Sequence, residues 1–75
     1  MDWRDRIAVE PGKRSGKACV RGTRIAVADI LSYLAAGETD ASLLTEFLQF
    51  KAEDIRAALS YAADSERHTK LLAAE

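Results

Sequence analysis

The sequence predicts a mainly α protein, in which an N-terminal β-hairpin is followed by a three-helix bundle of the helix-turn-helix kind. Its 75 residues are enough for one small domain. Short strand-like runs broken by glycine occupy the first third, and apolar residues recur at helical spacing thereafter. We therefore expect a single domain over residues 1–75, with a basic hairpin (1–25), a three-helix unit (26–68) and a helix extension or tail (69–75).

The first third of the chain indicates two short strands joined by a basic loop. Residues 7–10 alternate in the manner of a strand, and Pro11–Gly12 ends that run. Cys19–Val20 and Ile25 then predict a second short strand with a tight bend at Gly22. Because an isolated hairpin is only marginally stable in water, we expect it to lie on the helices or to pair with another chain.

Helices account for the remainder. The first is expected over residues 27–36, and Gly37 follows it where a left-handed C-terminal cap is needed. Thr39 or Asp40 can cap the second helix through a side-chain oxygen.

The third helix is expected to begin at residue 51 or 52, with Glu53 and Asp54 in its first turn, where acids suit the helix dipole. It either continues through His68 to residues 71–72 or frays and leaves 69–75 as a loose tail. Apolar residues at spacings of three and four mark the faces that should form the core. These are Val27, Ile30, Leu31, Leu34, Ala35, Leu43, Leu44, Phe47, Ile55, Ala58, Leu59, Ala62 and Ala63, with Leu48 as a further candidate.

The net charge of −1 conceals a polarity along the chain. Residues 1–25 hold seven basic and three acidic side chains, whereas residues 26–75 hold four basic and nine acidic ones. Such an asymmetry suggests that the N-terminal part faces something anionic. The alternative is a solvated basic loop that balances an acidic helical body.

Composition excludes several classes of protein. One cysteine, Cys19, rules out an internal disulfide framework, and Cys19 with the single His68 cannot complete a four-ligand zinc site. No apolar run approaches the roughly 20 residues of a membrane span, and residues 1–6 lack the apolar stretch of a signal peptide. We expect a cytoplasmic protein that binds no membrane and needs no cofactor.

Enzymatic chemistry is also not expected. The stretch Gly12–Ala18 has three residues between its glycines where a nucleotide-binding loop needs four, and Ala18 stands where a Ser or Thr would hold magnesium. His68 has no obvious catalytic partner, and Cys19 lies in an apolar strand pattern that favours a buried structural role. The sequence therefore favours a binding protein over an enzyme.

The segment from Arg21 to Arg24 holds the strongest candidates for binding. If Gly22 bends the chain, Arg21 and Arg24 project toward one surface, with the Thr23 hydroxyl between them. Guanidinium groups bind carboxylates and phosphates in bidentate fashion. The alternative for Arg24 is structural, with its side chain satisfying helix carbonyls or pairing with an acid such as Asp29.

A pattern of residues across most of the chain matches a known family. It comprises Trp3, Ile7, Glu10–Pro11, Gly16–Lys17, Arg21–Ile25, Val27, Gly37, Glu53–Ile55 and Ala57–Leu59. With these residues the chain resembles the bacterial family of unknown function DUF433. The resemblance implies a homeodomain-like three-helix fold after a hairpin. It also implies the role of an antitoxin in a two-gene pair, whose partner is a PIN-like nuclease toxin.

Two functions remain open at this point, beside a third alternative, a self-associating module with no toxin partner. The first is an antitoxin that docks on a PIN-like nuclease, inserts Arg21 or Arg24 among the carboxylates that hold its metal ions, and has autorepression of its operon as a secondary role. The second is a helix-turn-helix DNA-binding regulator without a toxin partner. Acidic residues at the start of the third helix disfavour the second. Under either, we expect a homodimer, and a partner or nucleic acid bound through Lys13, Arg14, Lys17, Arg21, Thr23 and Arg24.

Overall fold

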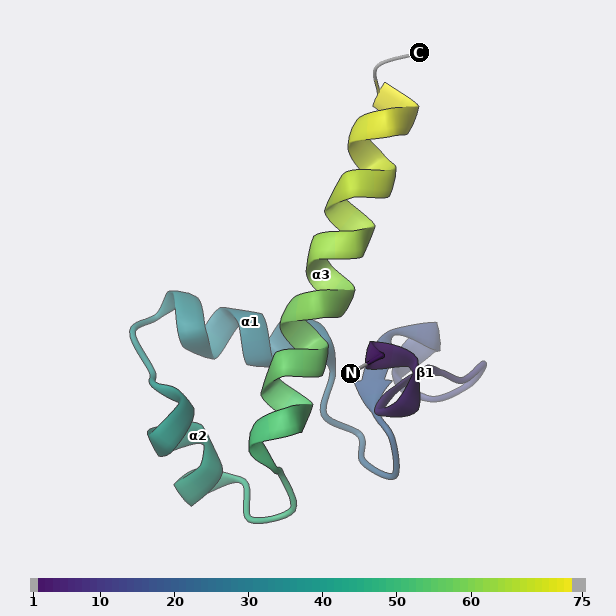
Figure 1. Ribbon diagram of the computed structural model, residues 1–75. Coiled ribbons are helices and arrows are strands. Elements are labelled where there is room, and N and C mark those ends of the chain that lie inside the picture. Colours follow the sequence, from purple (N-terminus) through teal and green to yellow (C-terminus); the bar gives the residue numbers. More distant parts are fainter. Residues whose placement is uncertain (1, 74–75) are drawn as a thin grey trace.

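The computed structural model describes the backbone of residues 2–73 and the side chains of residues 2–67. It confirms the predicted fold class: an antiparallel two-stranded hairpin is followed by three helices. The long third helix runs through the middle of the molecule, with the hairpin on one side and the two shorter helices on the other (Figure 1). The elements are η1 (Trp3–Asp5), β1 (Ile7–Val9), η2 (Arg14–Gly16), β2 (Ala18–Val20), α1 (Val27–Ala35), α2 (Asp40–Glu46) and α3 (Ala52–Ala73).

Beyond the hairpin the chain doubles back at the predicted glycine. In the hairpin itself, Ile7 of β1 lies opposite Val20 of β2. Gly22 has a φ of +75°, a conformation that glycine adopts without steric cost. The following residues run back beside β2: the Val20 N–H donates to the Ile25 carbonyl at 3.0 Å, and Cys19 bridges to Ala26. The second strand therefore ends at Val20, and Ile25 belongs to a separate extended segment that pairs with it.

The helix ends agree with the sequence. Gly37 follows α1 with a φ of +102°, and its N–H donates to the Leu34 carbonyl at 3.1 Å, which forms the expected left-handed cap. Thr39 caps α2, since its hydroxyl accepts the Ser42 N–H at 3.1 Å. At the C-terminus the helical alternative is the one that forms, because α3 continues to Ala73.

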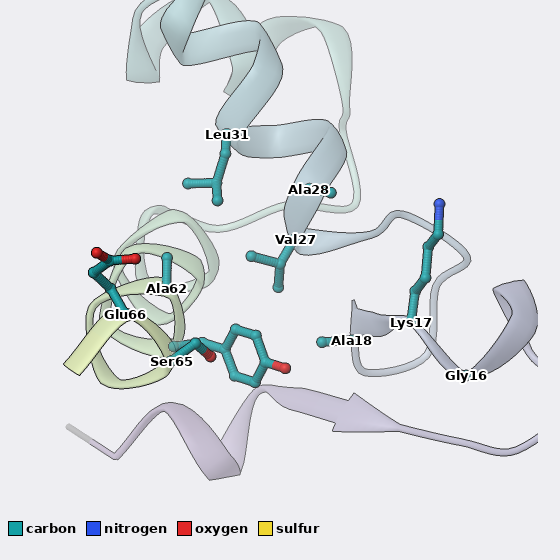
Figure 2. A pocket seen from close by; sticks show the side chains of 10 residues that line it. Gly16, Lys17, Ala18, Val27, Ala28, Leu31, Ala62, Ser65 and Glu66 are labelled. Atoms are coloured by element: carbon teal, nitrogen blue, oxygen red, sulfur yellow. The ribbon is translucent and has the colours of Figure 1, made fainter. Parts of the chain in front are cut away.

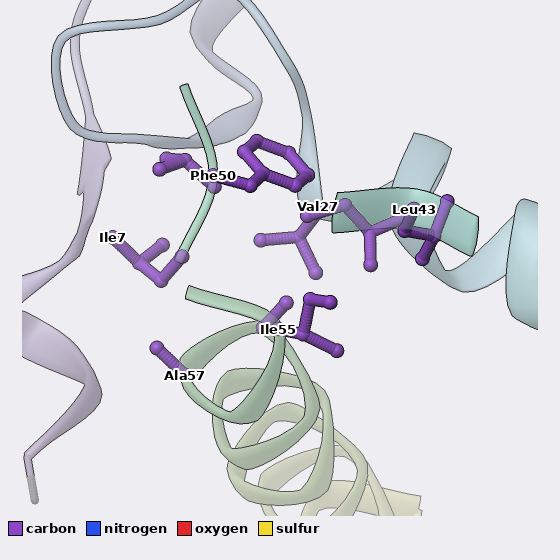
Figure 3. Close-up of a cluster of buried hydrophobic side chains, with 9 residues drawn as sticks. Ile7, Val27, Leu43, Phe50, Ile55 and Ala57 are labelled. Carbon is purple, nitrogen blue, oxygen red and sulfur yellow. The ribbon is translucent and has the colours of Figure 1, made fainter. Parts of the chain in front are cut away.

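The core lies where the hairpin, α1 and α2 meet the N-terminal half of α3 (Figure 3). Ile30, Leu43 and Ile55 contribute fully buried side chains from the three helices, and Ile7 joins them from β1. Packing of the hairpin against the helices gives its strands the support that an isolated hairpin lacks. The complete buried cluster is Ile7, Val20, Val27, Ile30, Leu43, Phe50, Ile55, Ala57 and Ala58.

Some predicted core positions are wrong. Leu48 is 85% exposed because α2 has already ended at Glu46, so the helical register no longer applies, and Phe50 enters the core instead. Leu59 is 45% exposed, and Ala35 and Ala63 are also exposed, since each lies toward the outer edge of its helix face. Cys19 is buried, in agreement with the structural role expected for it.

Trp3 ties the N-terminus to α3. Its ring packs edge-on against Tyr61 with 4.9 Å between centroids. The Arg4 guanidinium lies over the Trp3 ring, 4.5 Å from the ring centroid. The indole N–H donates to Asp64 Oδ2 at 2.7 Å. Beyond this contact α3 projects away from the rest of the molecule (Figure 1). Over the described residues, no helix is long and apolar enough to cross a membrane.

Candidate functional site: a basic hairpin and the pocket beside it

The Arg14 side chain, in the loop between the strands, is bonded to residues that follow the hairpin. Its Nη1 donates to the Arg24 carbonyl at 2.7 Å and to Asp29 Oδ2 at 3.1 Å. The sequence suggested that Asp29 could pair with Arg24, but the acid pairs with Arg14 instead. Arg14 therefore connects the loop between the strands to the start of α1.

Arg21 is exposed, and its side chain is held in one orientation. Its Nε and Nη2 both donate to the backbone carbonyl of Arg4, at 3.3 and 3.0 Å. A carbonyl is a neutral acceptor, so these bonds fix the guanidinium without cancelling its charge. Arg21 thus presents an oriented positive charge to solvent.

Thr23 and Lys13 have local partners. The Thr23 hydroxyl donates to the Val20 carbonyl at 2.8 Å and accepts the Ile25 N–H at 3.1 Å, so it stabilises the turn. The Lys13 ammonium lies 3.2 Å from the Glu10 carboxylate. Both of these side chains are therefore committed to structure near the hairpin.

Lys17 and Arg24 differ from the other nominated residues. Both are exposed, and neither side chain makes an ion pair or hydrogen bond with any of the side chains described, residues 2–67. Their charges are the ones in this set that are most available to a partner.

A polar pocket of about 370 Å³ opens between the turn after β2 and the loop that joins α2 to α3. These two turns lie at the same end of the molecule (Figure 1). We call it the basic pocket, because three basic and two acidic side chains line it. Its lining residues are Asp5, Arg6, Val20, Arg21, Gln49, Lys51 and Asp54.

An ion pair at the base of this pocket was not anticipated from the sequence. Asp54 is only 5% exposed; its Oδ1 accepts from Arg6 Nη1 at 2.9 Å, and its Oδ2 accepts the Lys51 N–H at 2.9 Å. The second bond had a sequence signal, because an acid three residues after a helix N-cap is a capping pattern. The first had none, since Arg6 and Asp54 are 48 residues apart.

A second hollow, the apolar groove, lies between the hairpin, α1 and α3 (Figure 2). It measures about 560 Å³, and Val27, Leu31 and Tyr61 supply much of its wall. Lys17 and Glu66 lie at opposite edges of it (Figure 2). Small side chains also line the groove, namely Ala18, Ala28 and Ala62.

The arrangement is suited to binding charged groups. Within the described part of the chain, no three His, Cys, Asp or Glu side chains gather in a way that could hold a metal ion. The exposed cations Lys17, Arg21 and Arg24 can donate several hydrogen bonds to an oxyanion. Such an oxyanion is a carboxylate on a protein or a phosphate on a nucleic acid.

Comparisons with known proteins place the chain in a family. The family model described as a protein of unknown function, DUF433, matches residues 7–62. The crystal structure of a DUF433 member protein from Anabaena variabilis, determined at 2.00 Å resolution, has a TM-score of 0.81 and 30% sequence identity to this chain. The match covers 96% of this chain and 71% of that chain, and no curated protein matches significantly. The chain therefore belongs to the DUF433 family of proteins of unknown function.

Proposed function

We propose that this protein is the antitoxin of a bacterial type II toxin–antitoxin pair, and that it binds and neutralises a PIN-like nuclease without itself catalysing a reaction. The observation that carries the proposal is the pair of exposed arginines, Arg21 and Arg24, in the turn that follows β2. The charges of both are left unmatched by acids among the described side chains.

These cations suit the active site of a metal-dependent nuclease. Such a site gathers carboxylates around its metal ions, and a guanidinium that enters it can pair with the same carboxylates in bidentate fashion. The exposed side chain of Arg24 has no partner among those of residues 2–67, whereas Arg21 is oriented by the Arg4 carbonyl. In this proposal Arg24 enters the nuclease site, and Arg21 and Lys17 bind the nuclease beside that site.

Co-expression with the product of the adjacent gene tests the proposal. With a tag on this chain alone, we expect a stoichiometric complex and relief of the neighbour's toxicity. Arg24→Ala should reduce both, whereas Arg56→Ala, which removes an exposed arginine outside both hollows, should leave them unchanged. A tagged chain that emerges alone beside a harmless neighbour would sink the antitoxin proposal.

A DNA-binding regulator is the second candidate. One observation weakens the argument that the acidic residues at the start of the third helix raised against it. Asp54 is buried and paired with Arg6, so it does not present an unmatched charge at the start of α3. Glu53 remains exposed there, beside exposed Lys51 and Arg56. Binding to a duplex from the upstream region, followed by fluorescence anisotropy at several salt concentrations, tests this function, because phosphate contacts give a steep salt dependence.

We also propose that the chain forms a homodimer and represses its own operon. The hairpin has two strands, and Val9 at the end of β1 is 56% exposed, so the sheet offers apolar surface that a second copy could cover. Light scattering at several protein concentrations measures the mass directly. A monomer at all concentrations would remove the dimer from this proposal and leave the antitoxin role untouched.

A further inference from the structure

Two of the three cations in the basic pocket, Arg6 and Arg21, have guanidinium groups whose positions are fixed before any ligand arrives. Two hydrogen bonds to the Arg4 carbonyl orient the Arg21 guanidinium, and Asp54 orients Arg6. Lys51 enters the pocket from the other turn, and its backbone N–H is held by Asp54. Side chains that are already ordered lose less entropy when a ligand binds, so this geometry favours recognition.

The charges that line the pocket favour the binding of one anion. Asp54 is matched by Arg6, and the other charged side chains of the lining are Arg21, Lys51 and Asp5. One positive charge is therefore in excess among the five charged side chains of the lining. A single oxyanion balances it, and the Gln49 amide at the rim offers a further hydrogen-bond donor.

The surroundings favour a protein carboxylate over a nucleic-acid phosphate. Leu48 precedes Gln49 in the same loop and is 85% exposed. Burial of a leucine side chain against another protein raises affinity by roughly tenfold or more. The phosphate groups of a nucleic acid offer the leucine no apolar surface. The carboxylates of Asp5 and Glu53 at the same end would repel a polyanion more strongly than one acidic side chain.

We propose that the basic pocket is the receptor for an acidic side chain of a protein partner, with Leu48 as the apolar anchor beside it. The proposal rests on the antitoxin function proposed above and names a second contact of that interface, distinct from the Arg24 that enters the nuclease site. Arg21 and Lys51 bind the carboxylate, Arg6 remains paired with Asp54, and Leu48 packs against an apolar neighbour of the acidic residue.

A short acidic peptide tests the pocket without the toxin. The probe is acetyl-Leu-Asp-Leu-amide, titrated into the ¹⁵N-labelled full chain while amide shifts are followed by NMR. The isosteric control is acetyl-Leu-Asn-Leu-amide, which keeps the shape and lacks the charge. We expect saturable shifts at Arg21, Gln49 and Lys51 with the acidic peptide, and binding roughly tenfold weaker with the control, as for the loss of a charged hydrogen bond.

Variants assign the effect to named side chains. Lys51→Gln should weaken peptide binding severalfold and keep the fold, because the Lys51 side chain is exposed and only its backbone N–H supports the helix start. Leu48→Ala should weaken binding of both peptides. Arg56→Gln, the matched control outside the pocket, should change neither.

Two results would overturn the proposal. One is equal binding of the acidic and neutral peptides. The other is displacement of the acidic peptide by a duplex at equal ionic strength, with duplex binding lost in Lys51→Gln, which would assign the pocket to nucleic acid. Peptide binding with the expected variant pattern supports the pocket even when co-expression captures no toxin, so failure of the antitoxin function is seen separately.

Discussion

Arg6 and Asp54 join the two ends of the fold through an ion pair of 2.9 Å between Nη1 and Oδ1. Arg6 immediately precedes β1, and Asp54 lies in the first turn of α3. The same carboxylate accepts the Lys51 N–H, so one acid both caps the helix and fixes the hairpin against it. This contact also sets the floor of the basic pocket, which connects the stability of the fold to its proposed binding surface.

Removal of this carboxylate should destabilise the whole domain. Asp54→Ala leaves a partly buried guanidinium and the Lys51 N–H without their acceptor, and we expect a loss of about 2–3 kcal/mol in the free energy of unfolding. Glu53→Ala, an exposed acid one residue earlier, should change it by less than about 0.5 kcal/mol. Urea unfolding followed by circular dichroism measures both; equal values for the two variants would contradict the structural role of Asp54.

Arg14 and Arg24 should separate structure from binding. Arg14→Ala removes the bonds to the Arg24 carbonyl and to Asp29, and should cost about 1–2 kcal/mol of stability. Arg24→Ala should cost less than about 0.5 kcal/mol, because its exposed side chain has no partner among those described. Unfolding curves, read beside capture of the co-expressed neighbour, should show stability falling in the first variant and binding falling in the second. The reverse pattern would exchange their roles.

Trp3 should contribute to stability through packing. Trp3→Ala removes an indole that lies edge-on to Tyr61, and we expect a loss of about 2–3 kcal/mol, toward the low end for tryptophan because the ring is half-buried. Trp3→Phe keeps an aromatic ring at the same place and should lose much less. Thermal and urea unfolding of the two variants gives the comparison. An alanine variant as stable as the parent would show that η1 does not support α3.

The same tryptophan should control a titration. Its indole N–H, and after it the Arg67 guanidinium, hold the pKa of Asp64 below the ordinary value of 3.8. Because the pKa is lower in the folded state, the stabilisation is complete above 3.8 and is lost as the pH falls through the folded value. Asp64→Asn should therefore flatten the decline of the melting temperature between about pH 5 and pH 2. Carboxyl NMR should also show that Trp3→Phe raises the pKa of Asp64; an unchanged pKa would contradict the role of the indole.

Local pattern in the sequence determined most of the secondary structure. The glycine at position 37 and the threonine at position 39 define helix ends through bonds that span only a few residues, and a prediction from neighbours alone is therefore correct. The same holds for the bend at Gly22, where the left-handed conformation requires glycine. Leu48 shows the limit of this approach, since the periodicity does not show that the helix has already ended two residues earlier, at Glu46.

Only the tertiary structure decided which charges are free. From the sequence, Arg14 and Arg24 were both candidates for binding, and Asp29 was offered as a partner for Arg24. In the structure Arg14 pairs with Asp29, whereas Arg24 has no partner among the side chains of residues 2–67. Likewise, the sequence indicates Asp54 only as an acid in the first turn of the third helix. Folding places its partner Arg6, 48 residues away in the chain, beside it. The physical reason is range: caps and turns depend on atoms a few residues apart, whereas the charge of a surface depends on partners that only folding brings together.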